Sequence, residues 1–210
     1  MQNTSTRKKT LFLAQFSLLL AIEAIVCFTP LGSILAPVMV GTLSHIPVIA
    51  TAILLGWKAG AVMGFFFGTF SFLVFSFVSP GVMSFVFTPF HNAGDEFPQG
   101  NGWSLVICFV PRILIGVVTG LVYDALKKHD VRSEVTYALP AILGSLTNTV
   151  LVLGGIWRFF AQPFLGDTEY TAGAMWAVLS SIVLTNGIPE AVAAWVVGLY
   201  VCKPLKKFAQ

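Results

Sequence analysis

Long apolar segments with few charged residues constrain this chain more than any other feature. Apolar residues make up 56% of its 210 residues and charged residues only 10%, whereas soluble domains carry about 25% charged residues. A chain with so little polar surface must have lipid as its solvent. We therefore expect an all-α polytopic membrane protein with six transmembrane helices in one domain over 1–210. The spans are expected at about 10–28, 44–55, 59–78, 103–126, 135–160 and 173–201.

The second segment is shorter than the others. A helix rises about 1.5 Å per residue, and crossing the hydrocarbon core takes about 20 residues. The segment at 44–55 falls well short of that length. It is therefore expected to be tilted, partly re-entrant or extended by the polar residues that precede it.

The positive charges predict the orientation of the chain, because Lys and Arg concentrate in cytoplasmic loops. The acidic residues Asp95, Glu96, Asp167 and Glu169 lie in the loops on the other side, which contain no Lys or Arg. Both termini are therefore expected in the cytoplasm. The short basic groups do not form the clustered face of a nucleic-acid-binding protein, so nucleic acid is not an expected partner. These groups are Arg7, Lys8, Lys9, Lys58, Lys127, Lys128, Arg132, Lys203, Lys206 and Lys207.

The outer loop between the third and fourth spans, at 79–102, is long and mixed in composition. Loops of this length without regular structure are commonly lids or binding loops. The loop is not expected to be a solvated connector, because such a connector would expose the rings of Phe85, Phe87 and Phe90 to water. We interpret the loop as a roof over a binding site.

Glycines recur at four-residue spacing in two spans, as Gly60, Gly64 and Gly68 and again as Gly116 and Gly120. Small residues at this spacing let helices approach closely in a membrane. Packing inside the bundle is favoured over an interface with a partner.

Polar residues inside spans are costly and usually functional. Counting from the cytoplasmic charges at about 1.5 Å per residue gives four of them matching depths of roughly 20–22 Å. These four are Glu23, Arg112, Asn148 and Glu190. Asn186 lies slightly higher, and Arg158 is near the outer edge, where it can reach the interface.

Two interpretations of this layer remain open. Arg112 and Glu190 are either an ion pair that fixes helix register or part of a solute site under the outer loop. Each follows a proline, Pro111 or Pro189, which removes a backbone hydrogen bond and frees a carbonyl for a ligand. The substrate-binding candidates are Arg112, Asn148, Glu190, Asn186, Trp103, Trp157, Arg158, Phe87, His91 and Asn92.

Catalytic and cofactor-binding motifs are missing from the sequence. There is no GxSxG, HExxH or P-loop, so we expect neither an enzyme nor ATP hydrolysis by this chain. Cys27, Cys108 and Cys202 lie in separate apolar runs without metal-binding spacing. No metal or cofactor is therefore expected.

The order of these features resembles the S components of energy-coupling-factor vitamin transporters. The resemblance is carried by LSHIPVIATAILLGWKAGAVMGFFFGTFSFL at 43–73, SFVFTPF at 84–90 and WSLVICFVPRILIGVVTGL at 103–121. It implies a vitamin-binding protein in the plasma membrane of a prokaryote. Such a protein docks on a transmembrane coupling subunit, the T component, and topples to release its solute inside. Two partner ATPases hydrolyse the ATP.

The resemblance also implies which helix face meets the coupling subunit. The family places a stripe of small residues on the first helix, and here the stripe consists of Ala14, Ser17, Ala21 and Ala24. Serine at position 17 departs from the alanine of the family pattern.

HIPV and SFVFTPF are most similar to pantothenate-type members of the family. Pantothenate carries a carboxylate, for which Arg112 or Arg158 is a suitable partner. Glu23 and Glu190 add acids to the same layer, so cobalamin, riboflavin and folate stay open as substrates. A stand-alone secondary transporter or channel is the alternative class, although the halves show no convincing inverted repeat.

Overall fold

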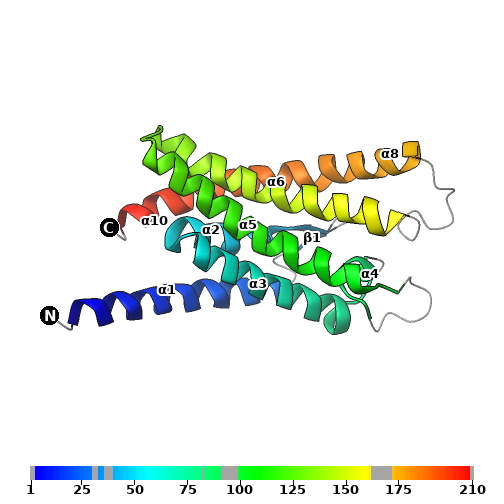
Figure 1. The fold of residues 1–210 in the computed structure, drawn as a ribbon, viewed down its shortest axis with the longest axis horizontal. Coiled ribbons are helices and arrows are strands. Elements are labelled where there is room, and N and C mark those ends of the chain that lie inside the picture. Colours follow the sequence, from blue (N-terminus) through cyan, green and yellow to red (C-terminus); the bar gives the residue numbers. More distant parts are fainter. Residues whose placement is uncertain are drawn as a thin grey trace.

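A computed structural model describes residues 3–29, 33–35, 40–81, 83–90, 99–161 and 172–208. Helices running along one common direction dominate the described part of the chain (Figure 1). Three π-helical turns, η3, η4 and η5, continue the helices that precede them. The helical elements are α1 (Asn3–Phe28), η2 (Leu43–His45), α2 (Ile46–Leu55), α3 (Trp57–Leu73), η3 (Val74–Val78), α4 (Ser84–Phe87), α5 (Gly102–Lys128), α6 (Ser133–Phe159), α8 (Ala172–Ile182), η4 (Val183–Gly187), α9 (Ile188–Val197), η5 (Gly198–Cys202) and α10 (Lys203–Phe208).

Five helices of the described residues are long and apolar enough to cross a membrane. They are Thr6–Phe28, Trp57–Val78, Gly102–Lys128, Ser133–Phe159 and Met175–Lys206. The expected second span is instead the shorter apolar helix Leu43–Leu55, about 20 Å long at 1.5 Å per residue. The 3-10 turn η2 begins one residue before the expected span, so this helix is hardly longer than the sequence predicted.

A short antiparallel pair of strands accompanies the helices of this all-α chain. Strand β1 (Ser33–Leu35) pairs with β2 (Val40–Thr42), with Ile34 opposite Gly41. The pair lies among the helices (Figure 1), and β2 contacts η4 and α9. Backbone at membrane depth must satisfy its hydrogen bonds within the protein, and strand pairing does so here. Strands of three residues are too short to show an alternating pattern in the sequence.

Helix α2 packs at the centre of the bundle. It contacts α1, α3, α5, α6 and α9, and Val48, Ile49, Ala52 and Ile53 are each 0% exposed. A helix that is apolar on every face is stable when other helices surround it. At its C-terminal end, Lys206 Nζ donates to the carbonyls of Ile53 at 3.2 Å and Leu54 at 2.7 Å, which closes this end of α2.

The glycine ladder of α3 faces inward, which confirms the interpretation as internal packing. A Cβ atom at Gly64 would overlap the backbone of Arg112 on α5, and one at Gly116 would overlap the backbone of Gly60. The glycines thus bring the backbones of α3 and α5 into direct contact. This crossing places Arg112 beside α3.

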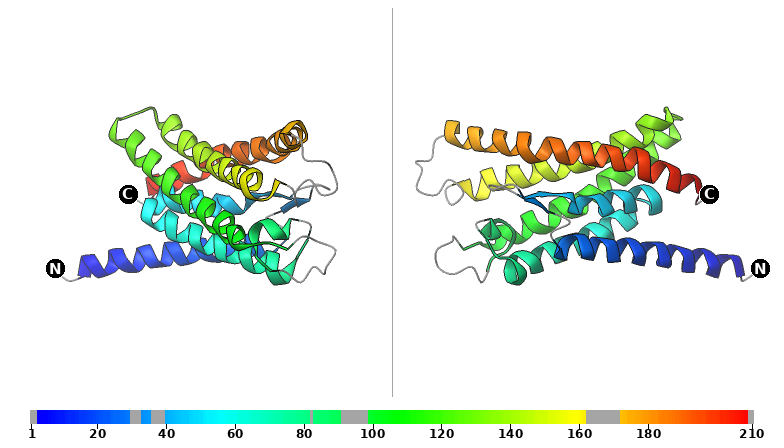
Figure 2. Two further views of the ribbon diagram at one scale, coloured as in Figure 1. Left: turned by 45° about the vertical axis from the view of Figure 1, so that its right-hand side comes forward. Right: turned by 180° about the vertical axis from the view of Figure 1, so that it is seen from behind.

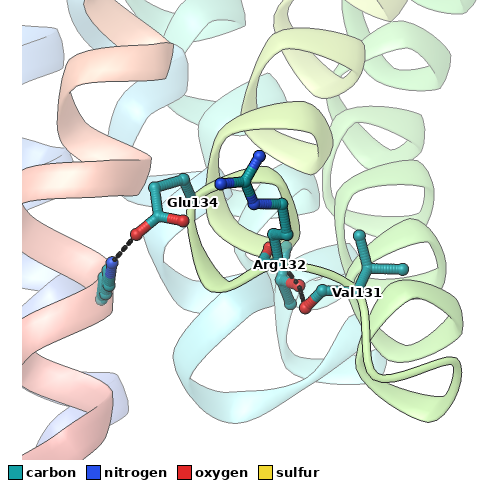
Figure 3. A network of polar contacts seen from close by, with 5 residues as sticks. Val131, Arg132 and Glu134 are labelled. Atoms are coloured by element: carbon teal, nitrogen blue, oxygen red, sulfur yellow. Dashed lines mark hydrogen bonds and ion pairs between the residues drawn. The ribbon is translucent and has the colours of Figure 1, made fainter.

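The basic segments of the sequence gather at one end of the bundle. The start of α1, the α2–α3 turn, the α5–α6 turn and α10 all lie at that end (Figure 1), while α1 and the last helix occupy opposite edges of the bundle (Figure 2). Glu134, at the start of α6, accepts a hydrogen bond from Lys203 Nζ at 2.8 Å (Figure 3). Both side chains are partly exposed, so this ion pair contributes little to stability.

Two separate apolar clusters form the core. The α2 cluster surrounds the central helix, and the α4 cluster lies under the short helix of the outer loop. The α2 cluster includes Val48, Ile49, Ile53, Met63, Phe67, Ile115, Ala141 and Ala194. The α4 cluster includes Phe85, Val86, Ile107, Leu153, Ile156, Phe160, Met175, Leu179 and Ile182.

Candidate functional site

Polar residues lie between the two apolar clusters along three helices. On α5, Arg112 lies between Ile107 of the α4 cluster and Ile115 of the α2 cluster. Asn148 on α6 and Glu190 on α9 hold the same position between members of the two clusters. A polar layer therefore separates two apolar regions, and this layer is the candidate site.

Arg112 is held by a hydrogen bond that the neighbouring proline makes possible. Pro111 has no N–H, so the carbonyl of Ile107, one turn earlier, loses its usual helical donor. Arg112 Nη1 donates to this carbonyl at 3.0 Å. The carbonyl that the sequence suggested for a ligand is thus occupied by the arginine, which fixes where the guanidinium lies.

Two aromatic rings lie close to the guanidinium of Arg112, a residue that is only 5% exposed. Its Cζ lies 4.5 Å from the ring centroid of Phe87 and 5.4 Å from that of Phe67. Phe87 belongs to α4, and its ring stacks on Phe75 with centroids 4.7 Å apart. Cation–π contacts are worth about 2 kcal/mol when desolvated. They stabilise a buried cation and leave its in-plane donors available.

Five buried polar atoms have no hydrogen-bond partner in the described part of the chain. Buried polar groups are normally paired, so each exception needs an explanation. Their number and their chemistry, with both donors and acceptors, favour a site for a polar solute. The atoms are Glu23 Oε2, Arg112 Nε, Thr119 Oγ1, Ser145 Oγ and Asn148 Oδ1.

Glu190 and Asn186 come from the last long helix. Glu190 is half-buried and lies within electrostatic range of Arg112. Asn186 is 8% exposed, lies in the π-helical turn η4 and donates from Nδ2 to Thr185 Oγ1 at 3.2 Å. π-Helical turns of this kind are frequent at functional sites.

Helix α4 is anchored to the bundle by side-chain hydrogen bonds. Ser104 Oγ donates to the carbonyl of Phe85 at 2.7 Å, and Ser76 Oγ donates to Thr88 Oγ1 at 2.7 Å. Phe85 is 2% exposed, whereas Phe90 is 51% exposed. The described part of the outer loop is thus packed against the helices, and it supplies Phe87 to the site.

Among the described residues, Trp103, Trp157 and Arg158 contact other rings rather than Arg112. Trp103 and Trp157 are exposed and contact other rings, Phe159 and Trp176 respectively. Arg158 is also exposed and lies over the Phe159 ring. An open groove of about 530 Å³ runs beside Trp103. His91 and Asn92 lie outside the described residues.

The predicted coupling stripe lies on the outer face of α1. Ala14, Ser17 and Ala21 are exposed and Ala24 is half-buried. Only 6% of the α1 span is buried inside the bundle. This helix thus presents a lipid-facing or partner-facing surface with small side chains.

Sequence reasoning missed Ser145 in the layer, and Thr119 and Phe67 beside it in the α2 cluster region. Thr119 follows Arg112 by two helical turns and Ser145 precedes Asn148 by one, so helical spacing alone could have placed them on the same faces. Phe67 gave no such signal, because nothing in its neighbourhood distinguishes it from other phenylalanines of α3.

A family model for the substrate-specific component of ECF transporters matches residues 11–201. The match covers most of the chain, and the chain therefore belongs to this family of transporter components. It is similar to the pantothenic acid transporter PanT of Lactococcus lactis subsp. cremoris (strain MG1363), with 35% identity over 166 residues. The aligned part covers 79% of this chain and 78% of the relative. The resemblance drawn from the sequence is thereby confirmed at the level of the family.

Proposed function

We propose that this chain captures pantothenate from outside the cell as the substrate-binding subunit of an ECF transporter. The observation that supports this most is the buried Arg112, whose Nε has no partner among the described residues. An arginine at membrane depth costs about 2.5–3.5 kcal/mol on insertion scales, so it is retained for a purpose. Similarity to a pantothenic acid transporter supports the choice of solute.

Arg112 supplies the cationic part of the proposed site. The pantothenate carboxylate would accept from the guanidinium Nε, next to the Phe67 and Phe87 rings. Charge-assisted hydrogen bonds of this kind are roughly twice as strong as neutral ones. The low local dielectric between the two apolar clusters strengthens them further.

Polar groups on α6 and the last helix would hold the rest of the solute. Asn148 Oδ1 can accept from a solute hydroxyl or amide N–H, because it has no donor among the described residues. Glu190 on α9 and Asn186 on η4 belong to the last long helix, which contacts α6. Phe87 on α4 would cover the solute from the outer loop.

Delivery would require docking on a transmembrane coupling subunit with two ATPases that hydrolyse ATP. The basic segments at one end of the bundle support cytoplasmic termini, and the proposed location is the plasma membrane of a prokaryote. The exposed stripe Ala14, Ser17, Ala21 and Ala24 would meet the coupling subunit, because small side chains permit close helix approach.

Reconstitution in proteoliposomes tests this function. The chain alone is expected to bind radiolabelled pantothenate without accumulating it, since it has no ATP-binding motif. Adding the coupling subunit and both ATPases with internal ATP should produce concentrative uptake. Accumulation by the chain alone would show a stand-alone transporter and contradict the proposal.

The variant Ala21→Leu serves in the same assay to test the docking face. It should weaken assembly with the coupling subunit and reduce uptake, while pantothenate affinity stays close to that of the wild type. Ala177→Leu is the matched control, because Ala177 is an exposed alanine on α8 at the opposite edge of the bundle. Unchanged uptake with Ala21→Leu would show that the stripe does not contact the coupling subunit.

A further inference from the structure

Helix α1 carries a fully buried carboxyl group, although most of this helix is exposed. Glu23 is 0% exposed, while only 6% of the α1 span is buried. It points toward the interior, where α1 contacts α2, α3 and η2. Burying a carboxyl group without a cation is costly, so a residue at this position needs a compensating partner.

The contacts of Glu23 satisfy only one of its two oxygens. Oε1 accepts from Cys27 Sγ at 3.3 Å, a weak donor. Oε2 is buried and has no hydrogen-bond partner among the described residues. No described Lys, Arg or His side chain forms an ion pair with Glu23. The carboxyl group therefore presents an acceptor that the described residues do not use.

Cys27 connects this acid to the surroundings of Arg112. Its thiol donates to Glu23, and its side chain packs against the α2 cluster. Phe67 belongs to the same cluster, and the Arg112 guanidinium lies over its ring. The unpartnered acceptor of α1 and the unpartnered donor of α5 thus lie beside one cluster inside the bundle.

We propose that Glu23 is a specificity-determining residue of the site, which accepts a hydrogen bond from a hydroxyl or amide N–H of the solute. The inference rests on the proposed function, in which Arg112 holds the solute carboxylate. A second anionic group cannot approach Glu23 without repulsion, so the two residues would fix the direction of the bound solute. Pantothenate matches this arrangement, because its two hydroxyl groups lie at the end opposite to its carboxylate.

Calorimetric titration with two ligands tests the inference on the whole chain in lipid nanodiscs. The ligands are pantothenate and its analogue in which hydrogen replaces both hydroxyl groups. The wild type should bind the analogue roughly 10- to 150-fold more weakly, the range expected for a hydrogen bond to a charged group. Glu23→Gln should weaken pantothenate binding and sharply reduce the ratio of the dissociation constants of the analogue and pantothenate. Glu134→Gln makes the same chemical change at an exposed residue and should keep the wild-type ratio.

The outcomes separate this inference from the proposed function. A wild type that does not bind pantothenate would overturn both. A wild type that binds pantothenate, together with a Glu23→Gln variant that keeps the full ratio, would overturn the role of Glu23 alone. If Glu23→Gln does not fold, alkylation of Cys27 by N-ethylmaleimide in a Cys108→Ala, Cys202→Ala background decides. Pantothenate should slow the reaction, and an unchanged rate would contradict the inference.

Discussion

Replacing Arg112 with alanine should weaken pantothenate binding by about 2–5 kcal/mol, the cost of truncating one partner of a buried charged hydrogen bond. This corresponds to a roughly 30- to 5,000-fold loss of affinity. Because the Arg112 side chain donates to the carbonyl of Ile107 on its own helix, the variant should still fold and insert. Calorimetry in nanodiscs measures the affinity, and thermal unfolding reports on the fold.

A double variant distinguishes this role from that of a structural ion pair. If the Arg112 side chain pairs with Glu190, then Arg112→Ala should lower the unfolding temperature, and adding Glu190→Ala should recover part of the loss. We expect no such recovery. A double variant with wild-type affinity would place the solute elsewhere, for example near Trp103. Arg112→Lys is the conservative variant, which keeps the charge but loses the planar fork, and it should bind with intermediate affinity.

Gly64→Ala should disrupt the α3–α5 crossing and solute binding together. The new Cβ would lie 2.7 Å from the carbonyl carbon of Arg112 and 2.8 Å from Cα of Ile113. Both are backbone atoms, so the two helices must move apart. Overpacking of this kind costs about 1–3 kcal/mol and occasionally more, and it displaces the helix that carries Arg112. We expect a lower unfolding temperature and weaker pantothenate binding.

Gly154→Ala is the matched control for the glycine variant. Gly154 lies within α6, and no described atom comes within 4 Å of a Cβ added there. The same substitution should therefore leave both stability and binding close to the wild type. If Gly64→Ala behaves like Gly154→Ala, that result would contradict the direct backbone contact between α3 and α5.

The long helices were predictable because the membrane imposes a minimum apolar length on every span. The expected span at 103–126 became Gly102–Lys128, and the expected span at 59–78 became Trp57–Val78. The π-helical turns and the strand pair were not predictable. A π-helical turn such as η4 leaves no mark in composition, and β1 and β2 contain only three residues each.

The sequence predicted a depth for the candidate site but not the contacts of its side chains. Counting residues from the cytoplasmic charges brought Arg112 and Asn148 to one level. The bond from Arg112 to the Ile107 carbonyl depends on the rotamer of a long side chain, which sequence spacing does not determine. The exposure of Trp103 was likewise hidden, because an interfacial tryptophan can face either lipid or a ligand.

Titration of pantothenate into the purified wild-type chain in lipid nanodiscs tests the central claim most directly. We predict saturable binding of one pantothenate per chain that riboflavin, folate and cobalamin do not displace. Absence of pantothenate binding, with saturable binding of one of those three vitamins instead, would contradict the account.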